Sequence, residues 1–153
     1  MKLEVTVSEI ADIFKEIQER PGQLFEMIRL DIKEAVGKYL TAMMNAELTH
    51  YLGRAPYVRV NGNVNHRNGS YGRGFALKGV GEVHVDIPRD RNGEFKTSVI
   101  PRSKQYEEEI ARDFSIMFLA GVSTRTLYMI SERLIGRRIS PTEISSASSD
   151  LNS

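Results

Sequence analysis

The chain has 153 residues, of which 41% are hydrophobic and 27% charged, and its formal net charge is +1. This length suits one compact domain or two small ones, and the composition is globular, which excludes a disordered or collagenous chain. The absence of cysteine excludes a disulfide framework, a thiolate zinc site and a cysteine nucleophile. No apolar run is long enough to span a membrane and no signal peptide is recognisable, so we expect a cytoplasmic protein without membrane contact.

Two helices are expected in the first part of the chain. Apolar residues recur at helical spacing from Ile10 to Ile17, and this helix should end near Arg20, because the residue before Pro21 is disfavoured in a helix. A second helix is predicted from Pro21 to about Leu52. About 30 residues would span roughly 45 Å, more than a small core covers. We therefore expect its apolar stripe to pack on another chain, making a homodimer, or on another domain; the alternative is one long helix with the first folded back on it.

The middle of the chain predicts a glycine-rich arm followed by a small sheet. Residues 53–74 hold several glycines and asparagines with almost no apolar periodicity, which is typical of a loop or extended arm. Residues 83–87 alternate apolar and polar side chains, the pattern of a half-buried strand. With flanking segments 75–77 and 95–100, they predict a three-stranded antiparallel meander.

The last third predicts three short helices arranged like a helix-turn-helix module. Ile110, Phe114, Met117 and Phe118 mark the first, which should end at Gly121. Ser123 or Thr124 caps the second, and Pro141 begins the third. The inward positions of the last two helices are predicted to be Leu127, Ile130, Ser131, Leu134, Ile144 and Ala147. The expected fold class is α+β, with N-terminal helices, the small sheet and these C-terminal helices.

Charge is distributed unevenly over these parts. Residues 1–53 carry six basic and nine acidic side chains, residues 105–153 carry five and seven, and residues 54–104 carry ten and four. We therefore divide the chain into a helical region (1–53), a basic arm with the sheet (54–104) and the helix-turn-helix-like module (105–153). A net charge of +6 in the middle region indicates an anionic partner, commonly nucleic acid, although a merely solvated basic surface would show the same count.

Catalytic constellations are not evident. The nucleotide-binding and serine-hydrolase motifs lack their minimal parts, and the three histidines have no ligand spacing. Glu82, His84 and Asp86 share one strand face and could hold a metal, but a solvated strand face is the favoured interpretation. We expect no catalytic residue, no metal site and no cofactor in this chain.

Double-stranded DNA is the partner that the basic segments favour. The stretch from His66 to Arg73 interleaves cations, an amide and an aromatic ring. Residues 88–93 predict a tight turn that displays two arginines. The alternative is that Arg89 and Arg91 only pair with Asp86, Asp90 or Glu94. The candidate DNA-binding residues are Arg67, Asn68, Tyr71, Arg73, Arg89, Arg91, Arg102, Lys104, Arg125, Arg137 and Arg138.

Several motifs resemble the N-terminal region of the Mutator-type bacterial insertion-sequence transposases. They are Asn65–Tyr71, Gly81–Val83, Pro88–Phe95, Gly121–Arg125 and Ile139–Ser145. The resemblance implies a DNA-binding portion that recognises the terminal inverted repeats of a mobile element for DNA transposition. It also implies an RNase H-like catalytic domain with two Asp, one Glu and Mg²⁺, which would begin after residue 153, so no activity is expected from this chain alone. The helix from Pro141 departs from the family in having no basic residues.

Two functions stay open at this point. The first is the DNA-binding, truncated N-terminal portion of a transposase. The second is an inert helical oligomerisation or regulatory remnant that pairs with an intact transposase through residues 23–52 and inhibits it.

Overall fold

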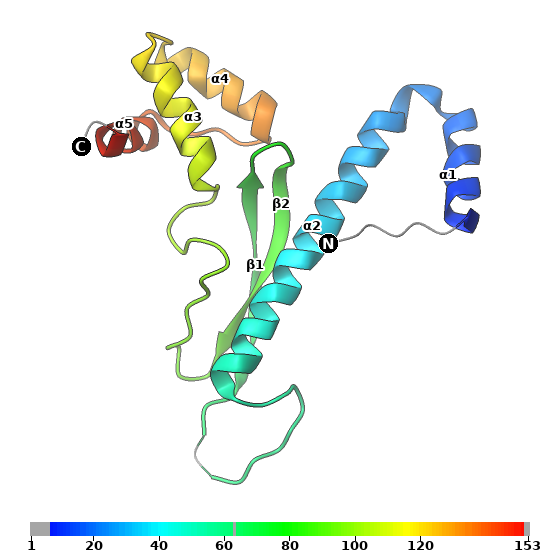
Figure 1. Ribbon diagram of the computed structural model, residues 1–153, viewed down its shortest axis with the longest axis vertical. Coiled ribbons are helices and arrows are strands. Elements are labelled where there is room, and N and C mark those ends of the chain that lie inside the picture. Colours follow the sequence, from blue (N-terminus) through cyan, green and yellow to red (C-terminus); the bar gives the residue numbers. More distant parts are fainter. Residues whose placement is uncertain (1–6, 63, 152–153) are drawn as a thin grey trace. The chain divides into compact units, whose positions relative to one another are not determined.

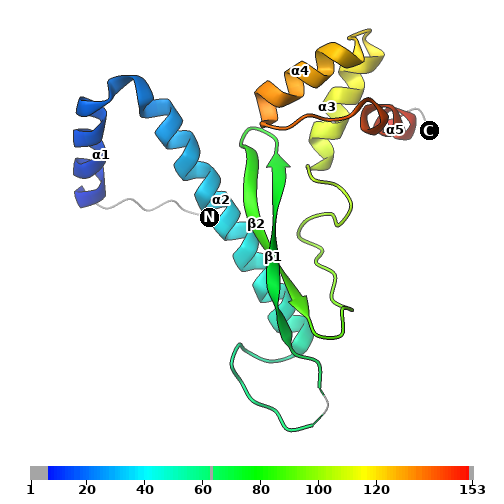
Figure 2. The same ribbon diagram turned by 180° about the vertical axis from the view of Figure 1, so that it is seen from behind.

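A computed structural model describes residues 7–62 and 64–151 (Figures 1 and 2). The chain divides into two compact units, residues 1–32 and 33–153. The fold is α+β, with helices, a two-stranded antiparallel sheet and then C-terminal helices.

The first unit is helical, as predicted. Helix α1 (Val7–Glu19) is followed by the short 3-10 turn η1 (Pro21–Gln23), and α2 (Leu24–Leu52) begins directly after it. The break falls at Pro21, which lacks an amide hydrogen and fits the first turn of a helix. Large apolar side chains on this unit are exposed, Phe14 by 58% and Phe25 by 72%.

The second unit is organised around a β-hairpin that packs on α2. Strand β1 (Arg67–Leu77) pairs antiparallel with β2 (Gly81–Asp90). The predicted alternation in β2 is confirmed, because Val83, Val85 and Ile87 are buried while the residues between them are exposed. These side chains form one core with Met44 of α2, which is completely buried. A two-stranded sheet needs such a helix on its apolar face.

Helix α2 also covers the free edge of β2. The backbone of Gly37 lies so close to the carbonyl oxygen of His84 that an added Cβ would come within 2.3 Å of it. One turn further on, the hydroxyl of Thr41 accepts a hydrogen bond of 3.0 Å from the backbone N–H of Asp86. A covered edge cannot pair with another strand. These contacts fix the hairpin against the helix.

The glycine-rich segment predicted as an arm is largely a strand. Residues 67–74 belong to β1, and the described residues 53–62 and 64–66 between α2 and β1 are irregular. Gly72 and Gly74 fit here because the side chains of His84 and Glu82 lie over them from β2; an added Cβ would meet those side chains at 2.5 and 2.7 Å. The glycines make room for these side chains, and the prediction of a loop or arm was wrong over residues 67–74.

The predicted third strand is also wrong. Residues 95–100 lie beside the hairpin in irregular conformation, and residues 88–90, predicted as part of a turn, extend β2 instead. In a third strand, the backbone N–H groups of this segment would bond a neighbouring strand. Here they donate hydrogen bonds to side chains. Asp90 accepts from the N–H groups of Glu94 and Phe95, and Glu47 accepts from that of Ser98. Backbone groups bonded in this way have no need of a strand partner.

Three C-terminal helices form a second core, as predicted. They are α3 (Glu108–Leu119), α4 (Thr124–Ile135) and α5 (Pro141–Leu151), and the predicted cap of α4 is present, with Ser123 Oγ accepting from the N–H of Thr126 at 3.2 Å. The buried residues of this core are Ala76, Tyr106, Ile110, Ala111, Phe114, Leu127, Ile135, Ile139 and Ile144.

One inward position of α4 was predicted wrongly. Leu134 is 64% exposed, and the next residue, Ile135, takes the buried place. Ser131 is buried as predicted, because its hydroxyl donates to the carbonyl of Tyr128 and accepts from the N–H of Ile139 at 3.0 Å. Its hydrogen bonds hold the connector between α4 and α5. The side chain of Ala147 lies outside the described residues.

Candidate nucleic-acid interface

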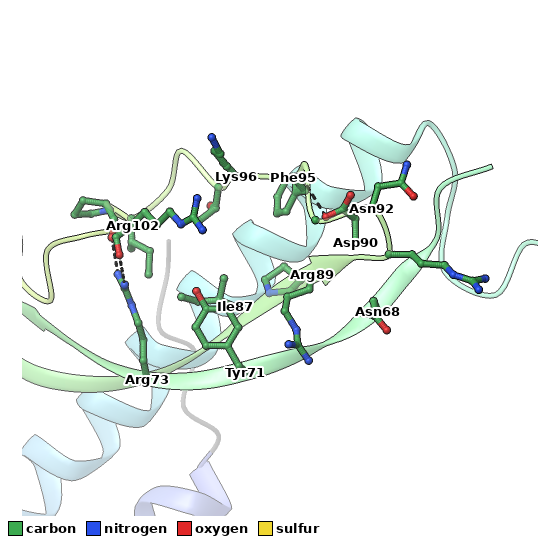
Figure 3. A pocket seen from close by; sticks show the side chains of 16 residues that line it. Asn68, Tyr71, Arg73, Ile87, Arg89, Asp90, Asn92, Phe95, Lys96 and Arg102 are labelled. Atoms are coloured by element: carbon green, nitrogen blue, oxygen red, sulfur yellow. Dashed lines mark hydrogen bonds between the residues drawn. The ribbon is translucent and has the colours of Figure 1, made fainter. Parts of the chain in front are cut away.

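A groove of about 350 Å³ lies between the hairpin and the irregular segment 91–102 (Figure 3). Strand β1 contributes Asn68, Tyr71 and Arg73, and β2 contributes residues 87–90. The remaining lining residues come from the segment opposite: Arg91, Asn92, Gly93, Phe95, Lys96, Thr97, Ile100, Pro101 and Arg102. Five cations and one carboxylate line this groove.

Four of the five cations are exposed. Arg89 lies beside Tyr71, with its guanidinium carbon 5.9 Å from the ring centroid, and Lys96 and Arg102 come from the opposite wall (Figure 3). Arg91 follows directly after β2. Within residues 7–62 and 64–151, neither Arg89 nor Arg91 forms an ion pair. Their charges are therefore available to a ligand.

The carboxylate in the groove, Asp90, already accepts hydrogen bonds from within the chain. Asp90 is only 3% exposed and accepts hydrogen bonds from Asn65 Nδ2 at 2.7 Å, from Glu94 N at 3.2 Å and from Phe95 N at 3.1 Å. Burial raises the pKa of Asp90, but these bonds outweigh burial and hold the pKa below its ordinary value. Asp86 faces His84, with 3.4 Å between Oδ1 and Nε2. Two of the three acids expected to neutralise Arg89 and Arg91, namely Asp86 and Asp90, thus bond other groups, and among the described residues Glu94 forms no ion pair with either arginine.

Arg73 holds the far end of the segment. Its guanidinium donates to the carbonyl oxygens of Pro101, Arg102 and Lys104 at 2.6, 2.8 and 3.2 Å. Its Nε is buried without a hydrogen-bond partner in the described structure. An arginine used in this way shapes the groove wall. Arg73 also lines the groove, and its contact with a ligand stays a prediction.

Glu47 of α2 holds the middle of the segment and was not identified from the sequence. Its carboxylate accepts from Thr97 Oγ1 at 2.5 Å, from Ser98 N at 2.8 Å and from Ser98 Oγ. Burial raises the pKa of Glu47, but the bonds from Ser98 and Thr97 outweigh it, so the pKa is lowered. Asp90, Glu47 and Arg73 together fix the segment at its start, middle and end. Glu47 and Thr97 are 50 residues apart in the sequence, so no local sequence pattern could predict their contact.

Lys96 is a cation of the groove that was not among the candidates from the sequence. It is exposed and lines the groove beside Arg102. The basic count of residues 54–104 included it, but the expected strand at 95–100 gave no reason to single it out.

The structure brings together Asn68, Tyr71, Arg73, Arg89, Arg91 and Arg102, and it leaves the other candidates outside the groove. Arg67 begins β1 and donates to the hydroxyl of Thr49. Lys104 and Arg125 are exposed away from the groove lining.

Arg137 and Arg138 have acidic and aromatic partners in the C-terminal module. Arg137 lies 5.7 Å from the ring of Tyr106, bonds Gln105 and is 3.9 Å from Glu143. Arg138 lies over the ring of Tyr128 at 4.8 Å and pairs with Glu132 at 2.9 Å. The hydrogen bonds from Arg138 to Glu132 and Tyr128 raise the pKa of its guanidinium further.

Neither a metal site nor a membrane helix emerges from the described residues. Over the described ranges, no three His, Asp or Glu side chains gather in a way that could hold a metal ion. Mg²⁺ of the kind that the family resemblance implies would need such a cluster, so these residues do not fit it. In the part of the chain that the structure covers, no helix is long and apolar enough to cross a membrane.

Comparison with known proteins decides the family. Residues 7–153 match the family described as "Transposase, Mutator family". The chain belongs to this family. It is 39% identical over 123 residues to the transposase for insertion sequence element IS905 of Lactococcus lactis subsp. lactis (strain IL1403), a match covering 77% of this chain and 31% of that relative.

Other members of the Mutator family match over the same part of their length. The transposase for IS1201 of Lactobacillus helveticus is 32% identical over 127 residues, covering 82% of this chain and 33% of the relative. The transposase for IS256 in transposon Tn4001 of Staphylococcus aureus is 29% identical over 134 residues, covering 84% and 34%. The chain thus spans about a third of the length of the curated relatives it matches.

Proposed function

We propose that this chain is the DNA-binding portion of a Mutator-family transposase and that its groove holds the DNA backbone. The observation that carries the proposal is the groove itself. Arg89, Arg91, Lys96 and Arg102 reach it from both walls, and its one carboxylate is bonded to backbone N–H groups. Cations gathered without acidic partners are the electrostatic signature of phosphate binding.

The rigidity of the groove supports the same role. Side chains fix both ends and the middle of the wall that carries Lys96 and Arg102, so little conformational entropy is lost when these cations meet phosphates. Tyr71 gives Arg89 an aromatic surface to lie against, which limits the positions of its guanidinium. Asn68 is exposed on the same lining and offers an amide that can bond phosphates or base edges.

The family suggests which DNA is bound. We propose that the groove engages the terminal inverted repeats of a mobile element for transposition. The three C-terminal helices would add a second contact of helix-turn-helix type, and the exposed Arg125 in the first turn of α4 supports this. Strand cleavage and joining with Mg²⁺ would be carried out by other parts of such a transposase.

A salt titration of DNA binding tests the proposal. Each phosphate contact contributes roughly one unit to the slope of log K against log salt concentration. We expect Arg91→Ala to weaken binding on DNA of many sequences and to reduce the slope by about one unit. Arg112→Ala is the matched control, because Arg112 is an exposed arginine paired with Glu109 on α3. An unchanged slope for Arg91→Ala would contradict the proposal.

Self-association is the second candidate function, with or without DNA binding. The exposed apolar side chains of α2 favour it, since Ile28 and Ile32 lie on one face of the helix and are each 42% exposed. A second copy is the occupant we propose for this face, because a two-fold dimer matches two inverted DNA ends. If Ile32→Glu and the parent chain are both monomeric at micromolar concentration by light scattering, this candidate fails.

A further inference from the structure

The loop between α2 and β1, described over residues 53–62 and 64–66, exposes several apolar side chains. Tyr57 is completely exposed, and Val58 and Val60 are exposed by 51% and 43%. Side chains of this kind are normally buried, and a contiguous exposed group of them marks a contact surface. The groove proposal above makes no use of this loop.

The backbone of the loop supports a functional interpretation. Tyr57 has a φ of +65°, and it is the one residue other than glycine with positive φ among the described residues. A bulky side chain rarely adopts this left-handed conformation, because its Cβ crowds the backbone. Strained residues of this kind gather at binding sites, where the protein holds a side chain outward. Here the conformation presents the Tyr57 ring wholly to solvent.

The base of the loop is closed and tied to the groove. Arg54 donates to the carbonyl of Asn65 and lies 3.0 Å from Nδ1 of His66, which brings the two ends of the loop together. Asn65 then bonds Asp90 through its Nδ2 at 2.7 Å and accepts from the N–H of Asn92 at 3.2 Å. Because Asp90 and Asn92 both line the groove, the loop and the groove share one support.

Charge favours DNA over a protein partner. Residues 53–81 hold five Lys or Arg and not one Asp or Glu. Arg59 is exposed between Val58 and Val60, so the apolar tip carries a cation. Figure 1 shows the loop projecting beyond the end of the hairpin at which β1 begins and β2 ends. An apolar wedge flanked by cations is how proteins enter DNA between base steps while they hold its backbone.

We propose that the loop tip is a DNA wedge, in which Tyr57 stacks on a base of an opened or unpaired step while the neighbouring groove holds the backbone. This inference rests on the proposed DNA-binding function and deepens it. The groove would supply salt-dependent affinity, and the loop would supply a preference for DNA that can be unstacked. Every base has a π-face, so the contact is tolerant of sequence.

The test compares two DNA probes, a mixed-sequence duplex and the same duplex with one unpaired base next to a 2-aminopurine. We expect the parent chain to prefer the second probe and to raise the 2-aminopurine emission on binding. Tyr57→Ala should weaken binding to that probe about 10-fold, the size expected for loss of one stacked base, and should abolish the emission change. The salt slope should remain that of the parent, because no phosphate contact is removed.

Two controls separate stacking from other effects of substitution. Tyr57→Phe keeps the ring and should behave like the parent. Tyr39→Ala removes a tyrosine that is 46% exposed on α2 and should bind both probes like the parent. Thermal unfolding of Tyr57→Ala should match that of the parent, because its fully exposed ring buries no area.

The outcomes distinguish this inference from the proposal it rests on. If the parent chain binds neither probe in a salt-dependent way, the proposed function and the wedge both fail. If the parent binds with a steep salt slope and Tyr57→Ala binds both probes equally well as the parent, the wedge alone is overturned. A loss of affinity that accompanies a lower sedimentation coefficient would assign the loop to contact with a second copy and would also overturn the wedge.

Discussion

The arginines of the groove and those of the C-terminal module differ in what surrounds them. Arg89 and Arg91 form no ion pair with any described residue, and Asp90, which lies between them in the sequence, bonds backbone N–H groups. Arg137 and Arg138 each lie over a tyrosine ring and face a glutamate. An arginine paired with an acid stabilises the fold, whereas one without an acidic partner can bind an anion. The sequence analysis named all four as candidate DNA ligands.

The largest expected effect comes from removing the carboxylate that supports the groove. Asp90→Ala would leave partly buried donors of Asn65, Glu94 and Phe95 without their acceptor, at a cost of about 3 kcal/mol in the free energy of unfolding. It would also weaken DNA binding although the net charge becomes more positive, because the cations lose their fixed positions. Chemical denaturation and anisotropy titration check the two effects. Asp86→Ala on the exposed face is the matched control, and equal losses for both variants would contradict this role of Asp90.

Acid should weaken the two carboxylates that support the groove. The pKa values of Asp90 and Glu47 are lowered in the fold below their ordinary values of 3.8 and 4.5. Each therefore contributes stability that is fully present above its ordinary pKa and is lost as the pH falls through the lowered value. We expect stability to fall with pH in this acidic range, and less steeply in Glu47→Gln, which has no titratable carboxylate at this position. Urea unfolding at a series of pH values measures this; identical pH profiles for the two proteins would refute it.

Arg137→Ala tests whether an arginine of the C-terminal module contributes to stability and not to DNA binding. Loss of its contacts with Tyr106, Gln105 and Glu143 should lower the free energy of unfolding by about 1–2 kcal/mol. The slope of DNA affinity against salt should not change, because this guanidinium is already engaged. Unfolding and binding are measured on the same variant. A reduced salt slope with unchanged stability would place Arg137 among the DNA ligands.

The smallest effect is expected from Glu132→Ala, which removes the acidic partner of Arg138. An exposed pair of this kind is worth at most about 1 kcal/mol, so the midpoint of unfolding should barely move. The substitution leaves Arg138 without its carboxylate and converts a module arginine into one resembling Arg91. A slight gain in DNA affinity is therefore expected at low salt, whereas a loss would contradict the comparison.

Sequence patterns predicted the parts of the fold that local interactions determine. Pro21, Ser123 and Pro141 mark helix starts through their own backbone chemistry, and the alternation of Val83 and Val85 reports one buried face. Each signal lies within a few residues of the structure it predicts. Helix and strand positions were therefore predicted well in these places.

The predictions were wrong where residues distant in the sequence determine the local conformation. The expected strand at residues 95–100 does not form, because Glu47 and Asp90 bond backbone N–H groups of that segment. The glycine-rich stretch became a strand because Glu82 and His84 cover Gly72 and Gly74. The contacts of Arg73 with distant carbonyls likewise became evident only in three dimensions. Six of the eleven candidate residues line the groove. The sequence did not separate these six from the other five, because contacts with residues distant in the sequence determine which side chains lie in the groove and which have partners elsewhere.

A paired salt titration of two double variants tests the central claim most directly. One variant is Arg89→Ala with Arg91→Ala, and the other is Arg137→Ala with Arg138→Ala, so each removes two positive charges from a chain of the same length. The account predicts that the groove variant loses about two units of the slope of log K against log salt concentration, whereas the module variant keeps the slope of the parent chain. Equal slopes for the two variants would contradict it.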